Sequence, residues 1–142
     1  MSPSDFDGVI AAYRQALQEF AKGDPRPVAE LFSRRDDVTL ANPLGPPRLG
    51  WAEVETAIDG AAANFTGGSV DFEEVSRYAT PDLGYVVQLE RQEARLTGRE
   101  DMARISLRVT MVFRREGDTW KVVHRHADPI TTARAITTII EA

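Results

Sequence analysis

The sequence contains no cysteine. This absence excludes a disulfide framework, a thiolate metal site and a cysteine nucleophile. Long apolar runs are also missing, because no stretch approaches the roughly 18 apolar residues of a membrane-spanning helix. The first eight residues, MSPSDFDG, have neither the basic region nor the apolar core of a leader peptide. We therefore expect a soluble, cytoplasmic protein.

Excess positive charge and nucleotide-binding motifs are absent as well. The formal net charge is -5 at pH 7, which argues against a protein that binds the phosphate backbone through a basic face. The chain has no glycine-rich phosphate loop, nucleophile elbow or dinucleotide fingerprint. We expect no cofactor, no nucleic-acid partner and no membrane partner. At 142 residues and without internal repeats, the chain is expected to form a single domain over 1–142.

The first half of the chain carries three helical patterns. The most regular one follows a start signal in Ser2-Pro3 and Asp5 and ends at Gly23. A shorter pattern covers 25–33 and a third covers 51–65, with apolar residues at helical spacing in each. Between them, 37–42 is expected to form a short strand, followed by a turn rich in proline and glycine.

The second half is predicted to form strands. Residues 70–78 and 84–96 flank the turn signal Thr80-Pro81-Asp82, and 103–128 has the pattern of a long hairpin. Helices followed by antiparallel strands predict an α+β fold. For the tail, 129–142, we expect a short helix that lies against the mouth of a pocket or against a second subunit.

The central hairpin suggests where a pocket would lie. Alternate residues of its second arm, from Trp120 through Val122, His124 and His126 to Asp128, share one parity. Because tryptophan and valine open this series, we expect the whole face to point inward. Both histidines of the chain would then lie inside, where helices that close over the sheet leave a pocket at its open end.

Several segments together resemble the NTF2-like superfamily, and within it the SnoaL-like proteins and ketosteroid isomerases. The resemblance rests on VAELF, DDVTLANPLG, GWAEVETAI and RVTMVFRREGDTWKVVHRHAD, in this order. It implies a cone in which a curved antiparallel sheet wraps three N-terminal helices around an apolar pocket. It also implies a homodimer through the outer face of the sheet.

The catalytic residues of the isomerases are mostly missing. Asn42 stands where the resemblance implies the general-base aspartate, and an amide cannot shuttle a proton near neutral pH. The second acid would fall near Met111, where no acid is present. Tyr13 corresponds to the first-helix tyrosine with a displacement of about one helical turn. We therefore do not expect steroid isomerisation by the usual mechanism.

The hairpin is also similar to the association domain of calmodulin-dependent kinases. The shared pattern is Trp, aliphatic, Val, His, any residue, His, which begins here at Trp120. The arginines that line the pocket in that family would fall at Met111 and Ala127. Because neither position carries an arginine, the resemblance gives no support for a carboxylate-binding site of that type.

His124 and His126 are the first candidates for chemistry. Histidine titrates near neutral pH, so either imidazole could move a proton in the pocket; a purely structural hydrogen bond to a neighbour is the alternative. Asp128 is the only obvious further metal ligand nearby, and a metal site needs at least three ligands, so we expect no metal. Asn42 could donate to a ligand, or it could only form a turn before Pro43.

The remaining candidates are expected to bind a ligand rather than to react with it. Tyr13 points inward by helical phase, and Trp51 and Trp120 could form a ligand wall or plain core. Met111 and Asp128 complete this set of expected ligand-binding residues. Glu90 lies mid-strand with Gln88 on its face, and a carboxylate facing the cone could act as a base. Because Tyr85, Val87 and Leu89 hold the other face, we expect Glu90 to point outward.

These residues lead to two alternative functions. The first is a lyase, isomerase or cyclase that acts on a small apolar carbonyl compound, in which a histidine moves a proton and Asn42 or Tyr13 stabilises an enolate-like oxygen. The second is a non-catalytic module for ligand binding or dimeric assembly. The asparagine at position 42 favours the second, and the two histidines favour the first.

Overall fold

The computed structural model describes residues 4–142 and has the predicted α+β architecture. Helix α1 spans Phe6–Phe20, and the side chain of Asp5 caps it by accepting a hydrogen bond from the backbone N–H of Gly8. Ser2 and Pro3, the other parts of the predicted start signal, lie outside the described residues. Helix α2 spans Arg26–Leu31 and α3 spans Trp51–Ala62, so all three expected helices are present with slightly shorter bounds.

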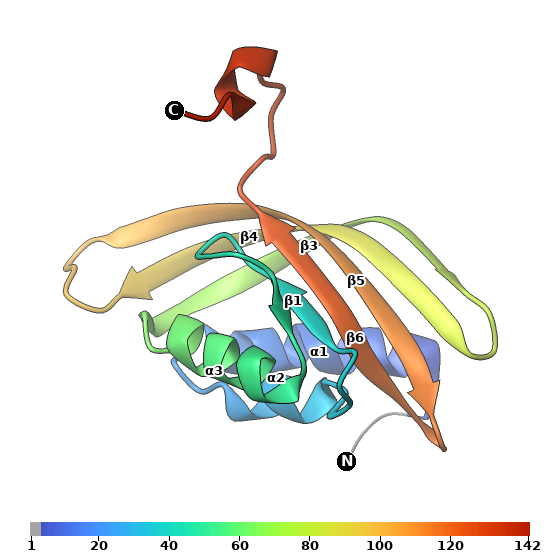
Figure 1. Cartoon of the computed structure of the whole chain (residues 1–142). Coiled ribbons are helices and arrows are strands. Elements are labelled where there is room, and N and C mark those ends of the chain that lie inside the picture. Colours follow the sequence, from blue (N-terminus) through green and yellow to red (C-terminus); the bar gives the residue numbers. More distant parts are fainter. Residues whose placement is uncertain (1–3) are drawn as a thin grey trace.

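A single six-stranded sheet curves over the three helices (Figure 1). Its order is β2-β1-β6-β5-β4-β3. The strands are β1 (Thr39–Ala41), β2 (Arg48–Leu49), β3 (Phe65–Ala79), β4 (Leu83–Leu96), β5 (Met102–Glu116) and β6 (Thr119–Asp128). All neighbouring strands are antiparallel except β1 and β6, which run parallel. The buried core fills the space between the concave face of the sheet and the helices.

The end of the chain leaves the body of the domain (Figure 1). It contains one short 3-10 helix, Ile136–Ile139, and the side chains of Ile136, Ile139 and Ile140 are 68–74% exposed. The expected contact with the pocket mouth is therefore wrong, and contact with a second subunit stays a prediction. In the described part of the chain, no helix is long and apolar enough to cross a membrane.

An irregularity in β6 decides which side chains face the interior. Val122 pairs with Phe113 and His124 pairs with Val112, so Val123 has no partner of its own on β5. Two residues on β6 thus replace one, which is a β-bulge. After a bulge, each side chain points to the face opposite to the one it would take in a regular strand.

The bulge turns the histidines outward. Before it, Trp120 and Val122 are buried; after it, Arg125 and Ala127 take the inner positions, at 8% and 3% exposure. His126 is exposed and His124 is half-buried. The prediction that both imidazoles and Asp128 share the inward face of Trp120 is therefore wrong, because it assumed an uninterrupted strand.

Candidate functional site

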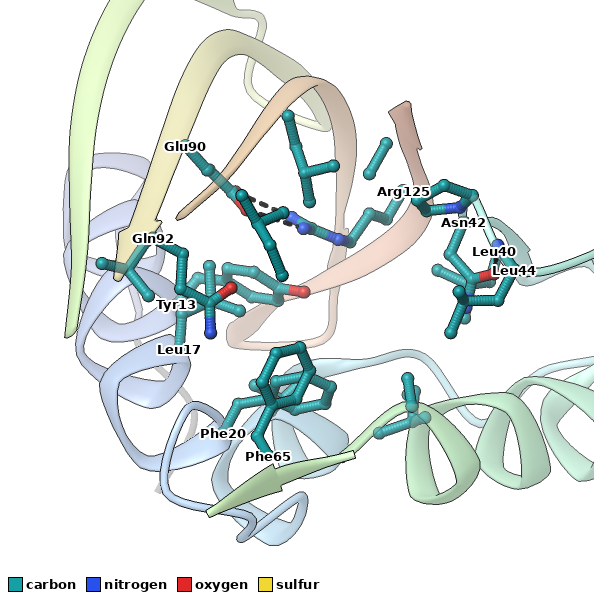
Figure 2. A pocket seen from close by; sticks show the side chains of 18 of the residues that line it. Tyr13, Leu17, Phe20, Leu40, Asn42, Leu44, Phe65, Glu90, Gln92 and Arg125 are labelled. Atoms are coloured by element: carbon teal, nitrogen blue, oxygen red, sulfur yellow. Dashed lines mark hydrogen bonds and ion pairs between the residues drawn. The ribbon is translucent and has the colours of Figure 1, made fainter. Parts of the chain in front are cut away.

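A cavity of about 200 Å³ lies between the helices and the open end of the sheet. Side chains from all three helices and from β1, β3, β4, β5 and β6 surround it, and most of them are apolar. Phe20 and Phe65 lie on one side of it (Figure 2). A largely apolar cavity with few polar groups is the usual form of a small-molecule site.

An ion pair between Glu90 and Arg125 forms the polar corner of this cavity (Figure 2). Nη1 of Arg125 donates to Oε2 of Glu90 at 2.9 Å, and Nη2 donates to Oε1 at 2.7 Å. Glu90 is 4% exposed and Arg125 is 8% exposed. Burial disfavours the charged guanidinium, but Glu90 and Tyr13 together outweigh this effect and raise the pKa of Arg125 above its ordinary value. Arg125 therefore keeps its positive charge.

The two partners come from strands that are not neighbours. Arg125 lies on β6 and Glu90 on β4, with β5 between them. The guanidinium crosses β5 above Met111, whose sulfur is 3.4 Å from Nη1. Met111 was expected to contact a ligand; it is 1% exposed and supports Arg125 from beneath without lining the cavity.

Tyr13 completes the polar corner. Its hydroxyl points into the cavity (Figure 2), and Cζ of Arg125 lies 5.6 Å from the centre of its ring. Burial raises the pKa of Tyr13 to about 12; nearby Arg125 lowers it in part, and Glu90 raises it. The phenol thus keeps its proton at neutral pH and can donate a hydrogen bond to a ligand. The expected inward direction of Tyr13 is confirmed.

Asn42 lies across the cavity from Glu90 and Tyr13 (Figure 2). Its Oδ1 accepts a hydrogen bond from the backbone N–H of Leu44 at 3.0 Å. Asn42 therefore forms the expected turn before Pro43 and also lines the cavity. Its Nδ2 group carries two further N–H donors.

The histidines belong to a polar network on the outer face. Nδ1 of His124 is 2.8 Å from Oγ1 of Thr39, and Nε2 of His126 is 2.9 Å from Oδ2 of Asp128. Burial, followed by repulsion from His126, lowers the pKa of His124. Hydrogen bonds from Arg108 are the main reason that the pKa of Asp128 falls to about 2. None of the three predicted residues His124, His126 and Asp128 lines the cavity.

Neither tryptophan lines the cavity. Trp51 begins α3 and stacks against Arg34, whose Cζ is 3.8 Å from the centre of its ring. Trp120 packs edge-on against Phe6 at a centroid distance of 5.3 Å. The alternative reading, in which these side chains are structural, fits this placement. Residues 4–142 also contain no group of three or more His, Asp or Glu side chains that could hold a metal ion.

The sequence did not reveal the ion pair of the site. Glu90 was expected to face outward and is buried on the inner face, so that expectation is wrong. Arg125 was not considered, because the regular alternation of β6 placed it outside. The available signal was the pairing of opposite charges: an inward Glu90 needs a buried cation, and a one-residue shift of β6 supplies one.

The model of the SnoaL-like domain family matches residues 9–131. Among solved structures, a ketosteroid isomerase-like protein from Erwinia carotovora atroseptica is 16% identical, with 89% of this chain and 94% of that chain covered and a TM-score of 0.74. A proposed dehydratase of the NTF2-like family from Streptomyces avermitilis is 22% identical, with 87% and 92% covered and a TM-score of 0.72.

A proposed calcium/calmodulin-dependent protein kinase type II association domain from Thiobacillus denitrificans is similar to the same degree. It is 22% identical, with 88% of this chain and 94% of that chain covered and a TM-score of 0.72. These identities show the fold that the proteins share. No curated protein sequence matches the chain.

Proposed function

The chain belongs to the SnoaL-like domain family of the NTF2-like superfamily, and from this starting point we propose that it binds a small, uncharged, mainly apolar carbonyl compound. One observation carries the proposal: an apolar cavity with a single ionic corner, made by Glu90 and Arg125 beside the hydroxyl of Tyr13. The apolar walls select a hydrophobic body, and the corner orients one oxygen atom.

The volume of the cavity limits the size of the ligand. An engineered apolar cavity of about 150 Å³ binds benzene, and the cavity here measures about 200 Å³. On this scale the ligand is a ring compound of roughly eight non-hydrogen atoms. The aromatic side chains of Phe20 and Phe65 fit a flat or cyclic body.

The charges in the corner favour an uncharged ligand. Arg125 is already neutralised by Glu90, so an anionic ligand would have to displace that carboxylate and leave a charge buried without a partner. Tyr13 remains protonated at neutral pH. A carbonyl oxygen that accepts from the Tyr13 hydroxyl satisfies this donor without adding charge.

The same geometry supports proton transfer of the lyase or isomerase type. Oε2 of Glu90 accepts hydrogen bonds from Gln88 and Arg125, whereas Oε1 accepts one, from Arg125. In the proposed step, Oε1 removes a proton from the carbon beside the carbonyl group, and the electron pair of the broken C–H bond forms the enolate. Tyr13 then donates to the enolate oxygen. Return of the proton to another carbon completes an isomerisation, and departure of a leaving group completes an elimination.

This assignment replaces histidine as the group that moves the proton. His124 and His126 face away from the cavity on the far side of β6, so neither imidazole can reach a ligand there. Glu90 and Tyr13 take the two roles of base and oxyanion donor, and Asn42 supplies a donor across the cavity.

The first experiment compares binding of matched neutral and charged compounds. We expect cyclic ketones of about eight non-hydrogen atoms to bind more tightly than the corresponding ring carboxylates in calorimetric titrations. Ala61→Trp should abolish binding by filling the cavity, and Ala63→Trp, at the exposed C-cap position directly after the same helix, is the matched control. Equal binding by Ala61→Trp and wild type would contradict the location of the site.

The second experiment tests the chemistry. Exchange of the proton beside the carbonyl group of a bound ketone for deuterium can be followed by NMR spectroscopy. Wild type should catalyse this exchange, and Glu90→Gln should reduce it by about a hundredfold or more, since an amide is no base. Tyr13→Phe should reduce it by a smaller factor of about ten.

A non-catalytic ligand-binding module is the second candidate function. Its support is the environment of Glu90, which accepts three hydrogen bonds, two of them from a cation. Oxygen atoms that already accept these bonds are less free to accept a proton from a ligand. Tight binding of a ketone without deuterium exchange would favour this candidate over proton transfer.

We also propose that the chain forms a homodimer through the outer face of the sheet. Tyr85 is 38% exposed on this face of β4, and Val87 and Leu89 beside it are half-buried. A row of apolar side chains on an outer sheet face favours burial against a second copy. Sedimentation analysis should give twice the chain mass, and Leu89→Glu should give the chain mass; a monomeric wild type at micromolar concentration would contradict the proposal.

A further inference from the structure

Gln88 connects the Glu90–Arg125 ion pair of the cavity to Arg14 on α1. It precedes Glu90 by two residues on the inner face of β4 and is 1% exposed. Its Nε2 donates to Oε2 of Glu90 at 2.8 Å. Its Oε1 accepts from Nε of Arg14 at 3.1 Å and from Nη2 of Arg14 at 2.7 Å. The amide therefore lies between a cation and an anion.

Only one orientation of this amide is compatible with its neighbours. The oxygen atom of Gln88 faces the donors of Arg14, and the nitrogen atom faces a carboxylate that can only accept. Rotation of the amide by half a turn would place N–H groups against N–H groups and oxygen against oxygen. Arg14 thus fixes the direction in which Gln88 donates, and Gln88 fixes one oxygen of Glu90.

Arg14 is itself held at the edge of the domain. Its Nη2 also contacts Oε1 of Glu74 on β3 at 2.9 Å, and its guanidinium lies over the ring of Phe72, 5.5 Å from the centre. Arg77 contacts the same oxygen of Glu74 at 2.6 Å. A continuous series of hydrogen bonds thus runs from partly exposed residues through Gln88 to the cavity.

We propose that Gln88 and Arg14 are positioning residues that hold the Glu90–Arg125 pair in a single geometry and so present Oε1 of Glu90 to the cavity. The inference deepens the proposed function and rests on it for the role of Oε1. Glu90 has charged or titratable groups facing it from two other elements, Arg125 on β6 and Tyr13 on α1. Its cross-strand neighbours Phe72 and Leu107 are apolar.

The positioning effect follows from how few contacts orient the carboxylate. With Gln88 in place, Glu90 is held by three hydrogen bonds from two directions, which prevents rotation about its last carbon–carbon bond. Without the Gln88 donor, the remaining two bonds both come from Arg125, so carboxylate and guanidinium can swing together. Arg14 acts one step further away, by excluding the reversed amide.

The test measures the rotation of the Arg125 guanidinium about its Nε–Cζ bond by ¹⁵N NMR spectroscopy of the ligand-free protein. Gln88→Met keeps the length of the side chain and removes the amide; Arg14→Met removes the cation. Gln88→Met should make the rotation about tenfold faster, as expected for the loss of one hydrogen bond to a charged group. Arg14→Met should accelerate it by a smaller factor of about three, because it only allows the reversed amide and leaves the Gln88 donor in place. Arg14→Lys, which keeps a cation and a donor, should restore a rate closer to that of wild type.

The control is Arg104→Met, which removes an arginine from an exposed ion pair with Glu93 and should leave the rotation of Arg125 unchanged. Equal rates in wild type, Gln88→Met and Arg14→Met would overturn the inference, as would equal acceleration by Arg104→Met. If Gln88→Met does not fold, the comparison of Arg14→Met with Arg14→Lys decides. Because no ligand is present, this result is independent of whether the cavity binds ketones.

Discussion

Removal of Arg125 should destabilise the protein far more than removal of an arginine from an exposed ion pair. Arg125→Met leaves the carboxylate of Glu90 buried, with only the Gln88 amide donating to it. Breaking a buried ion pair in this way costs about 3–5 kcal/mol, because one charge loses its partner without regaining water. Methionine retains most of the length of arginine, so packing on Met111 is largely kept and the loss is electrostatic.

A double-mutant cycle separates the pair from the single residues. Glu90→Leu should also cost about 3 kcal/mol or more, since it leaves the guanidinium buried alone. In the double variant both charges are gone, and replacement of a buried pair by apolar residues is often neutral or stabilising. With singles of about 3 kcal/mol each and a double variant within about 2 kcal/mol of wild type, the coupling energy is about 4 kcal/mol.

Urea unfolding, followed by the fluorescence of Trp51 and Trp120, gives the free energies. With a slope of about 2 kcal/mol per molar urea, a loss of 3 kcal/mol lowers the midpoint by about 1.5 M. The surface pair Arg104 and Glu93 is the control, with an expected coupling below about 1 kcal/mol. A cost of Arg125→Met below about 1 kcal/mol, or a coupling near zero, would refute the reasoning that the buried charges depend on one another.

Three further predictions use the same unfolding assay. The pKa of Tyr13 is about 12 in the folded state, above its ordinary value, so stability should fall as pH rises from about 10 to about 12; Tyr13→Phe should remove this dependence. The pKa of Asp128 is about 2, mainly through Arg108, so stability should fall as pH decreases from about 4 to about 2, by about 1 kcal/mol after screening, and Asp128→Asn should not show this loss. Gly68→Ala should cost about 2 kcal/mol or more, because Gly68 has φ +127° and a Cβ there would overlap a backbone carbonyl of β4, whereas Gly45→Ala, at an open position, should be nearly neutral.

The three helices and the long strands β4 to β6 could be predicted because each depends on local signals. The start of β3 was wrong: the strand begins at Phe65, which was expected to end the third helix, and not at residue 70. In α1, apolar residues recur at helical spacing from Val9 to Leu17, and each of these faces the core. In β5, the alternation through Val109, Met111 and Phe113 continues without interruption, and all three are buried as expected. Where an element is regular, the period of the sequence is sufficient to assign its faces.

The alternation of residues in β4 could not by itself show which face of the strand is buried. Tyr85, Val87 and Leu89 share one face, and Gln88 and Glu90 share the other with Val86. Apolar content favours the first group as the inner face, yet the second group is buried. The deciding interaction comes from Arg125, 35 residues away in sequence, and no local pattern in β4 contains that information.

The Glu90–Arg125 ion pair accounts both for the burial of Glu90 and for the position of the bulge in β6. Without the extra residue Val123, a regular strand would place Arg125 on the outer face and His124 inside. Glu90 would then be a buried carboxylate without a cation, at a cost of several kcal/mol. A bulge gives up about one ladder hydrogen bond, or about 1 kcal/mol. The balance therefore favours the bulged register, and the ion pair that orients a ligand in the cavity also determines which face of β6 is buried.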